Sequence, residues 1–213
     1  TINDQAEFTG TPTNTTVSNG TIKLTSKSGF WEEERLTYAP ATLSYGAGWA
    51  YVASTCKLYT PRGGNASTFY EYDIATDAWT TKGNTDATIY YGGFVIEGPS
   101  GYLYGAAGNN RANFMRYDIA QDDWDDSAAS DPTNTFHYGA SAVYDGSQYI
   151  YVTRGYNDDA FWRYDTTGDD WESMANTEFN GTSNTVYYGG ELAYDGADTI
   201  YAIQGNARHG FSA

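Results

Sequence analysis

Apolar and polar positions alternate along this chain in short blocks, and three of these blocks are nearly the same. They read FYEYDIATDAW at residues 69–79, FMRYDIAQDDW at residues 114–124 and FWRYDTTGDDW at residues 161–171. In each block a Tyr-Asp pair ends an aromatic run, and a Trp follows that Tyr by seven positions. An aromatic run, a polar turn and a second aromatic position predict two β-strands joined by a tight turn.

A second kind of block starts with Tyr-Gly, precedes each of these strand pairs and recurs once more after the last pair. Its starting tyrosines are Tyr45, Tyr91, Tyr138 and Tyr188, and each block runs into an apolar stretch that closes on Gly. The tyrosines inside that stretch are Tyr59, Tyr104, Tyr151 and Tyr201, which gives a period of roughly 45 to 50 residues.

One repeating unit is therefore expected to hold four short strands. The first starts at the Tyr-Gly pair, the second closes on Gly, the third carries Tyr-Asp and the fourth begins near the Trp. Turn signals lie between them, such as Asp-Gly at 145–146 and 195–196 and Thr-Thr-Gly at 166–168. We expect the Asp after each third-strand Tyr to accept backbone N–H groups of the following turn.

Sheets of this size need neighbours to cover both of their faces. When such sheets stack radially, each covers the next, and aromatic side chains such as Trp124 fill the wedge between them. We therefore predict an all-β fold, a β-propeller of about four four-stranded blades.

The repeated blocks resemble the kelch repeat of β-propellers, and most of all that of secreted prokaryotic kelch-like proteins. The resemblance rests on the Tyr-to-Trp spacing and on the Gly that closes the second strand, and it spans residues 45–205. Two features depart from the kelch pattern. The Gly pair of that repeat is kept only at Gly63-Gly64, and kelch propellers usually have about six or seven blades, more than this chain can supply.

The two ends of the chain carry complementary halves of a unit. Trp31 precedes Tyr45 by 14 residues, as Trp124 precedes Tyr138, and Leu24 stands seven residues before Trp31, where the repeat has its Tyr. Residues 21–37 are therefore expected to form the third and fourth strands of a blade.

At the other end, residues 188–205 supply the first and second strands of a unit, and Phe211 stands where its third strand begins. We expect the N- and C-terminal halves to complete one end blade. Three arrangements stay open: a compact ring closed within one chain, a head-to-tail polymer of chains, or a part of a longer propeller.

Residues 21–213 are thus assigned to the propeller, and residues 1–20 lie outside the repeat. This Thr-rich, polar and strand-prone segment is either an arm that adds a strand to a sheet edge or a flexible leader.

The amino-acid composition limits the classes of partner that the chain can bind. Lys and Arg total 11 against 27 Asp and Glu, a formal charge of −16, which argues against nucleic acid and anionic lipid as ligands. Aromatic residues make up 17% of the chain, which predicts a folded domain. No apolar run approaches the roughly 20 residues of a membrane-spanning helix, so no membrane insertion is expected.

Cysteine and sequon content bear on the compartment. Cys56 is the single cysteine, so an intrachain disulfide is excluded. Acceptor sequons for N-glycosylation occur at Asn14, Asn19, Asn65 and Asn180. With the secreted proteins that the repeat resembles, they lead us to expect an extracellular or cell-surface glycoprotein.

Two arginines are the candidate ligand-binding residues. Arg62 and Arg154 stand just before the closing Gly of their units, where Ala107 and Gln204 stand in the others. Loops near a propeller axis are common ligand sites, so this pair is a candidate grip for a carboxylate; the alternative is that each pairs with an acid of the protein itself. The third-strand residues Arg116 and Arg163 are expected to cover aromatic faces or to pair with acids.

Acidic clusters are expected to be turn acceptors and solvated charge, with one structural calcium as the alternative. They are Asp122, Asp123, Asp125 and Asp126; Asp158 and Asp159; and Asp169 and Asp170.

No cofactor or catalytic set is expected. His137 lies in register with aromatic residues of the other units, which indicates a packing role, and His209 is far from it in sequence. Two distant His and one Cys do not make a metal or nucleophile constellation.

These observations favour a non-enzymatic extracellular structural or adhesion module. It would contact protein partners or copies of itself, for instance as a surface filament subunit. The alternative is a propeller that binds or processes glycans at its axial mouth through Arg62 and Arg154.

Overall fold

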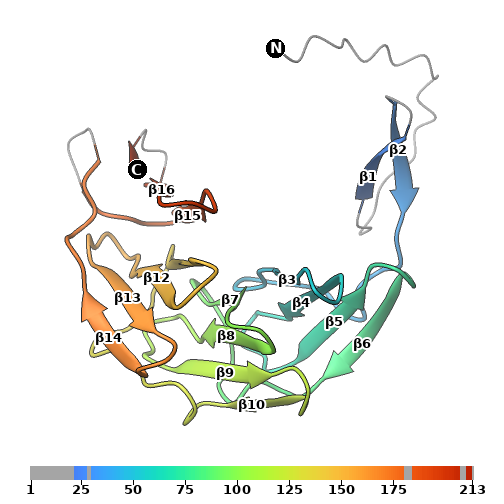
Figure 1. The fold of residues 1–213 in the computed structure, drawn as a ribbon, viewed down its shortest axis with the longest axis horizontal. Helices are drawn as coiled ribbons and strands as arrows, with labels where there is room; N and C mark the ends of the chain where they lie inside the picture. Colours follow the sequence, from blue (N-terminus) through green and yellow to red (C-terminus); the bar gives the residue numbers. More distant parts are fainter. Residues whose placement is uncertain (1–21, 28–29, 180–183, 207–209, 213) are drawn as a thin grey trace. The chain divides into compact units, whose positions relative to one another are not determined.

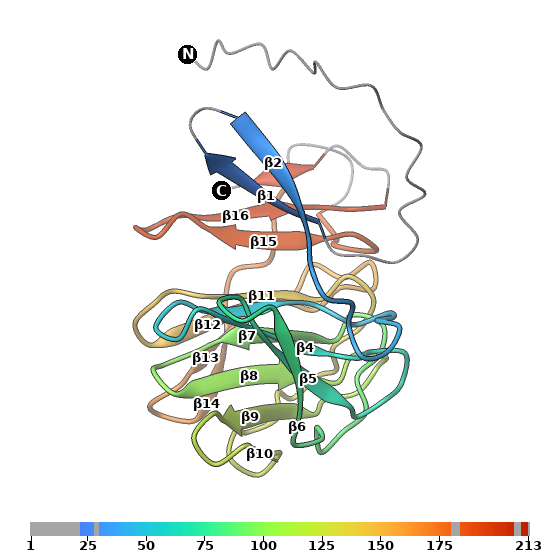
Figure 2. The same ribbon diagram turned by 90° about the vertical axis from the view of Figure 1, so that its right-hand side faces the viewer.

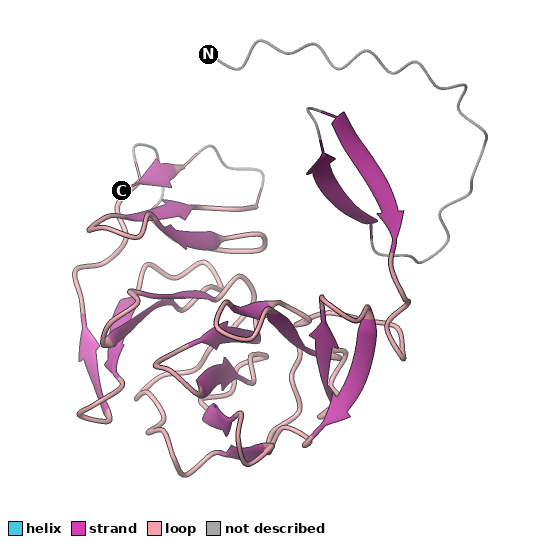
Figure 3. Cartoon of the chain, turned by 45° about the vertical axis from the view of Figure 1, so that its right-hand side comes forward, coloured by secondary structure: helices cyan, strands magenta, loops and turns pink. Residues whose placement is uncertain are grey.

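The computed structural model describes residues 22–27, 30–179, 184–206 and 210–212, and all of its regular elements are strands (Figures 1 and 3). The chain divides into two units, Thr1–Pro40 and Ala41–Ala213, which are described separately. Among the described residues there is no helix with the length and apolarity needed to cross a lipid bilayer.

The second unit consists of successive antiparallel sheets, each formed by strands in sequence order. The first sheet holds β3 (Ala50–Val52), β4 (Lys57–Pro61), β5 (Phe69–Asp73) and β6 (Ala78–Lys82). The second holds β7 (Phe94–Glu97), β8 (Tyr102–Ala106), β9 (Phe114–Asp118) and β10 (Asp123–Asp125). The third holds β11 (Ser141–Tyr144), β12 (Tyr149–Thr153), β13 (Phe161–Asp165) and β14 (Asp170–Ser173).

A fourth sheet holds three strands, β15 (Glu191–Tyr194), β16 (Ile200–Ile203) and β17 (Phe211–Ser212). The first strands of consecutive sheets contact one another, so that β3, β7, β11 and β15 follow each other around one axis, and Figure 2 shows β15 next to β11. This is the arrangement of blades in a β-propeller. The predicted all-β propeller of four-stranded blades is confirmed.

The predicted Tyr-Asp turn is confirmed between the third and fourth strands. Oδ1 of Asp73 accepts the backbone N–H groups of Ala75 at 2.9 Å and Thr76 at 3.0 Å. Asp118 and Asp165 make the same pair of bonds in their sheets. The carboxylates thereby satisfy turn N–H groups that no strand could pair.

Aromatic rings fill the space between neighbouring sheets, as the repeat predicts. A Tyr of the second strand stacks on the Phe that opens the third, and a Tyr and a Trp of the next sheet pack on that Phe. We call these four-ring groups the wedge clusters; they are Tyr59, Phe69, Tyr117 and Trp124 in one and Tyr104, Phe114, Tyr164 and Trp171 in the other. Trp124 is 3% exposed, which confirms its place as filler between blades.

The first strand of each unit does not start at the Tyr-Gly pair, so this part of the prediction is wrong. The pair forms a turn: Ala47 N–H donates to the Ser44 carbonyl at 2.8 Å, and Gly46, third of the four turn residues, has φ +88°. Positive φ at this position of a turn favours Gly. A Cβ on Gly92 would also lie 1.8 Å from the His137 carbonyl of the next unit, so Gly lets the turn approach its neighbour.

In the first unit, β1 (Ile22–Lys27) and β2 (Phe30–Arg35) pair as a two-stranded antiparallel sheet, as predicted for residues 21–37. The predicted register is wrong. Leu24 pairs with Glu33, and Trp31 pairs with Ser26, whereas each repeat Tyr pairs with its Trp. Leu24-Thr25 stands here in place of the Tyr-Asp pair of the repeat. Residues 1–20 lie outside the described residues.

The third strand of the fourth sheet begins where predicted. Phe211 pairs with Ile203, as Phe161 pairs with Thr153. In the described residues β1–β2 and β15–β17 are separate sheets, so the completion of one end blade by both ends of the chain stays a prediction.

Candidate ligand-binding surface

The four Tyr-Gly turns place one tyrosine from each sheet in a continuous row, which we call the tyrosine arc. It consists of Tyr45, Tyr91, Tyr138 and Tyr188. Successive ring centroids lie 4.4, 5.0 and 5.0 Å apart. Each carbonyl of the arc accepts a backbone N–H from the loop between the second and third strands of its own unit. We call the end of the propeller where these turns and loops meet the mouth.

The residue before three of the arc tyrosines adds a second row of rings. Tyr90, His137 and Tyr187 lie 4.2 to 4.3 Å by ring centroid from the arc residue that follows each of them. A hydrogen bond with the Tyr90 hydroxyl, followed by burial, raises the pKa of Tyr91. Burial, followed by a hydrogen bond with the Tyr187 hydroxyl, raises the pKa of Tyr188. These tyrosines therefore stay neutral and present hydroxyl groups.

One loop residue extends the aromatic surface in the third unit. The Tyr156 ring stacks on His137 with centroids 3.8 Å apart and an interplanar angle of 25°. His137 is 8% exposed, and its Nδ1 accepts the Tyr138 N–H at 2.9 Å. The packing role predicted for His137 is confirmed, and burial, followed by the charge of Arg154, lowers its pKa.

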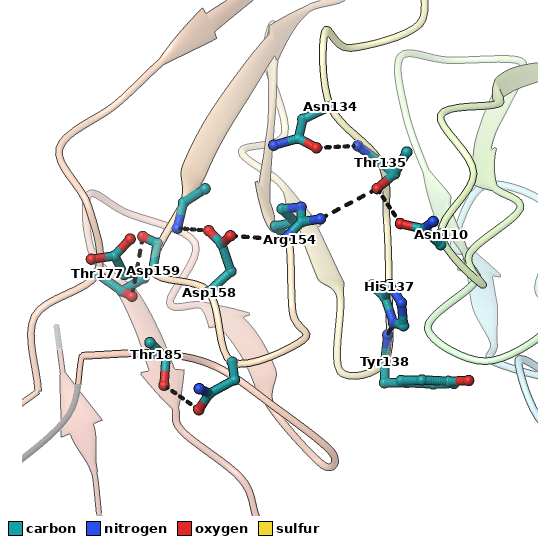
Figure 4. A network of polar contacts seen from close by, with 12 residues as sticks. Asn110, Asn134, Thr135, His137, Tyr138, Arg154, Asp158, Asp159, Thr177 and Thr185 are labelled. Atoms are coloured by element: carbon teal, nitrogen blue, oxygen red, sulfur yellow. Dashed lines mark hydrogen bonds and ion pairs between the residues drawn. The ribbon is translucent and has the colours of Figure 1, made fainter.

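Repeated Asn–Thr pairs fasten each unit to the next beside the arc. The Thr88 hydroxyl donates to Asn65 Oδ1 at 2.9 Å, and the Asn65 N–H donates to the Ile89 carbonyl at 2.9 Å. The following units repeat the hydroxyl–amide bond as Thr135 to Asn110 and Thr185 to Asn157 (Figure 4). Bonds of this kind hold neighbouring sheets at a fixed distance, so the arc rests on a rigid base.

Arg154 lies next to this base and is already paired. Its Nη1 donates to Asp158 Oδ2 at 2.7 Å, and its Nη2 reaches the Thr135 hydroxyl at 3.4 Å (Figure 4). Asp158 Oδ1 in turn accepts the Ala160 N–H. The alternative interpretation, an arginine paired with an acid of the protein itself, therefore describes Arg154.

Arg62 holds the equivalent position in the first sheet and is exposed. Its side chain makes no ion pair with any residue of the described ranges, and no contact joins it to Arg154. A carboxylate grip made by both arginines stays a prediction; Arg62 is the member that is open to a ligand.

The third-strand arginines behave as expected. Arg116 lies 4.7 Å from the Tyr102 ring centroid and Arg163 lies 4.4 Å from that of Tyr149. Arg163 also pairs with Glu172 at 2.6 Å. These two cations cover aromatic faces and do not contribute to the mouth.

Two residues of the acidic clusters lock sheets together. The Tyr117 hydroxyl donates to Asp122 at 2.7 Å, and the Gly83 N–H donates to the same oxygen at 2.8 Å. Burial alone would raise the pKa of Asp122, but these bonds and Lys82 hold it below its usual value. Asp169 repeats the arrangement with Tyr164 and with Ser130, so both carboxylates join neighbouring sheets. The predicted role of turn acceptor is confirmed for Asp125, whose Oδ1 accepts the Ser127 N–H at 2.8 Å.

The acidic residues at 122–126 do not form one cluster, because Asp122 bonds to the preceding sheet while Asp125 and Asp126 lie beside Asp86. Asp125 and Asp126 meet Asp86, with one oxygen of each within 4.8 Å of the others, and all three residues are exposed. Asp86 Oδ2 accepts the Asp126 N–H at 2.9 Å. Carboxylate oxygens suit calcium, which takes about six to eight oxygen ligands. A structural calcium stays a prediction, and these three residues are where it would bind.

Of the sequons, Asn65 lies in the described part, and its Oδ1 is engaged by Thr88. Asn14, Asn19 and Asn180 lie outside the described residues, as does His209. Glycosylation stays a prediction.

Sequence reasoning missed Tyr156, the second row of rings and the Asn–Thr pairs. The Tyr-Gly pairs recur with a common period, and in a propeller that period places their tyrosines in one row. Asn65, Asn110 and Asn157 stand three residues after equivalent positions 62, 107 and 154, which is a repeat signal that could have revealed the pairs.

No family model and no curated protein sequence matches this chain. Its fold is similar to that of YjhT, a protein of solved structure, with a TM-score of 0.62 and 16% sequence identity. The similarity covers 86% of this chain and 66% of the YjhT chain, so this chain spans less than two thirds of that protein. At this identity the likeness bears on the fold, and it supports the β-propeller.

Proposed function

We propose that this chain is a non-enzymatic extracellular structural or adhesion module. Its rigid propeller surface contacts protein partners or further copies of the chain, as in a surface filament. The observation that carries the proposal is the tyrosine arc: Tyr45 is 60% exposed and Tyr188 is 47% exposed at the two ends of one row of rings.

Protein interfaces are enriched in tyrosine because the side chain offers a large contact area, a hydroxyl group and little conformational entropy to lose. An arc held by turn and Asn–Thr hydrogen bonds is already ordered before a partner arrives, which lowers the cost of association. The resemblance of the repeat to that of secreted prokaryotic kelch-like proteins and the sequons support an extracellular setting.

Sedimentation velocity over a rising series of concentrations tests this function. The chain should associate, and a Tyr45→Ser, Tyr91→Ser double variant should lose that association. A Tyr51→Ser variant is the control, because Tyr51 is 46% exposed but lies outside the arc. Strictly monomeric behaviour at every concentration, or association that the double variant retains, contradicts self-assembly through the arc.

Glycan binding or processing at the mouth is the second candidate function. It is favoured by Arg62, whose side chain is exposed and whose backbone carbonyl accepts the Ser44 N–H at the Tyr45 turn. Binding on a glycan array that Arg62→Ala abolishes would promote this candidate, and an array without signal would remove it.

A further inference from the structure

Tyr156 breaks the repeat in both residue type and backbone conformation. It follows the closing Gly155 with φ +60°, in the place held by Gly64, Asn109 and Asn206 with φ between +53° and +62°. Gly and Asn adopt this left-handed region at little cost, whereas a bulky aromatic residue there is an outlier. Strain of this kind persists where the surroundings impose it, and it is concentrated at functional sites.

Hydrogen bonds to neighbouring backbone groups hold Tyr156 in this conformation. The Tyr156 N–H donates to the Tyr138 carbonyl at 2.8 Å, and the next N–H, of Asn157, donates to the Val186 carbonyl at 2.8 Å. His137, on which Tyr156 stacks, is itself a departure, since Tyr90 and Tyr187 stand at its place in two other units. Two departures from the repeat thus meet in one stack.

Tyr156 and three neighbouring tyrosines form a closed circuit of rings, which we call the tyrosine quartet. Its members are Tyr138, Tyr156, Tyr187 and Tyr188, with consecutive centroids 6.1, 6.1, 4.3 and 5.0 Å apart around the circuit. Tyr156 has one face on His137 yet is 48% exposed. Tyr188 has one face stacked on Tyr138 yet is 47% exposed. Both rings therefore keep about half of their area open to solvent in spite of these stacks.

An exposed tyrosine face attracts cations, because the ring quadrupole is negative above and below its plane. One cation stands beside this group: the charge of Arg154 acts on His137, and Asp158 pairs with that guanidinium at 2.7 Å. The formal charge of −16 draws cationic groups toward the protein as a whole.

We propose that the tyrosine quartet binds an organic cation, an alkylammonium or guanidinium group, against the exposed rings of Tyr156 and Tyr188. The proposal rests on the adhesion function and names the group that a partner offers to this end of the arc. The source is either a Lys or Arg side chain of a partner protein or a small quaternary ammonium compound.

The test uses the full chain, with calorimetric titration of choline and of its neutral isostere 3,3-dimethylbutan-1-ol. Choline should bind about tenfold more tightly than the isostere, because only the charge differs. A Tyr156→Asn variant should lose most of this affinity and still fold, because Asn stands at that place in two other units. Tyr51→Ser is the matched control and should bind choline as the unaltered chain does.

Equal binding of choline and the isostere would overturn the proposal, since the surface would then recognise apolar area alone. Unchanged choline affinity in Tyr156→Asn, or no choline binding at all, would overturn it as well. A Gly-Arg-Gly-Arg-Gly peptide that outcompetes choline identifies a protein side chain as the source, and the reverse order identifies a small cation. The sedimentation test uses Tyr45 and Tyr91, outside the quartet, so each proposal can fail without the other.

Discussion

The wedge clusters and the mouth are both built from aromatic rings that the same repeat places, yet they differ in how strictly they repeat. Between sheets, the Tyr–Phe–Tyr–Trp groups recur with the same partners, and Phe69 and Phe114 are fully buried. At the mouth, the arc recurs, but Tyr156 and His137 appear once and Tyr156 is half exposed. Strict repetition therefore marks what holds the blades together, and departure from it marks what distinguishes this chain.

Replacing Trp124 should have the largest effect on stability. Trp124→Ala removes a ring whose centroid lies 5.1 Å from that of Phe69 in the neighbouring sheet and 5.2 Å from that of Tyr117. Loss of this buried ring should lower the free energy of unfolding by about 3–5 kcal/mol. Urea denaturation measures this. Trp49→Ala is the control, because Trp49 is 46% exposed and its loss should cost far less. A cost below about 1 kcal/mol for Trp124→Ala would place the residue outside the interface.

Replacing Asp169, which joins neighbouring sheets, should have the second largest effect on stability. Asp169→Ala removes the acceptor of the Tyr164 hydroxyl and the Ser130 N–H, and it puts Ala at φ +54°, so we expect a loss of about 1–3 kcal/mol. Asp169→Asn keeps an acceptor and tolerates this φ, so it should retain most of the stability. Equal losses in both variants would mean that charge, and not the hydrogen bonds, is what matters.

The same residue gives a pH dependence with a defined sign. Burial alone would raise the pKa of Asp169, but the bonds from Tyr164 and Ser130 hold it below the ordinary 3.8. A carboxylate with a lowered folded pKa contributes stability above its unfolded pKa, and this is lost as the pH falls through the folded pKa. The stability gap between the unaltered chain and Asp169→Ala should therefore narrow below pH 3.8.

The sequence predicted the features that repeat and missed those that depend on which units become neighbours. The four-strand unit, the Asp turns, the buried Trp124 and the third strand at Phe211 all follow from local pattern and period. The strand start at Tyr-Gly is misplaced because Tyr45 and Gly46 form a turn that lies against the next unit, where a Cβ added to Gly46 would come within 2.2 Å of the Tyr90 carbonyl oxygen. The alignment of Leu24 with the repeat Tyr fails because a seven-residue spacing to Trp31 does not fix the strand pairing, and Leu24 pairs with Glu33.

At the candidate surface, the repeat predicts which positions are equivalent, but it does not predict which side chains contact one another. Arg62 and Arg154 look equivalent in the repeat, but Asp158 lies four residues after Arg154, whereas Ala66 lies four after Arg62. The ion pair that distinguishes them could have been read from that difference. The stack of Tyr156 on His137 could not, because the two residues are joined by the fold and by no sequence period.

His137 should give a smaller, pH-dependent effect. Burial, and then the charge of Arg154, lower its pKa from 6.5, so the unfolded chain holds the proton more tightly than the folded one. Its contribution to stability is complete above pH 6.5 and is lost as the pH falls through the lower folded pKa, with a slope of at most about 1.4 kcal/mol per pH unit. His137→Tyr, which copies Tyr90 and Tyr187, should reduce the slope of the unfolding free energy against pH between the folded and unfolded pKa of His137. An unchanged slope would assign the dependence to another group.

Replacing Tyr156 should have the smallest effect on stability. It should also distinguish most clearly between the rings of the wedge clusters and those of the mouth. Tyr156→Asn relieves the strain of an aromatic residue at φ +60° but loses the stack on His137, and these effects have opposite signs. We expect unfolding free energy to stay level or to rise by up to about 1 kcal/mol, measured by urea denaturation. A loss above about 1 kcal/mol would make Tyr156 a structural ring like those of the wedge clusters. A stability gain together with lost choline binding would show that the strain at this position is retained for recognition, because nothing in the folding of the propeller requires it.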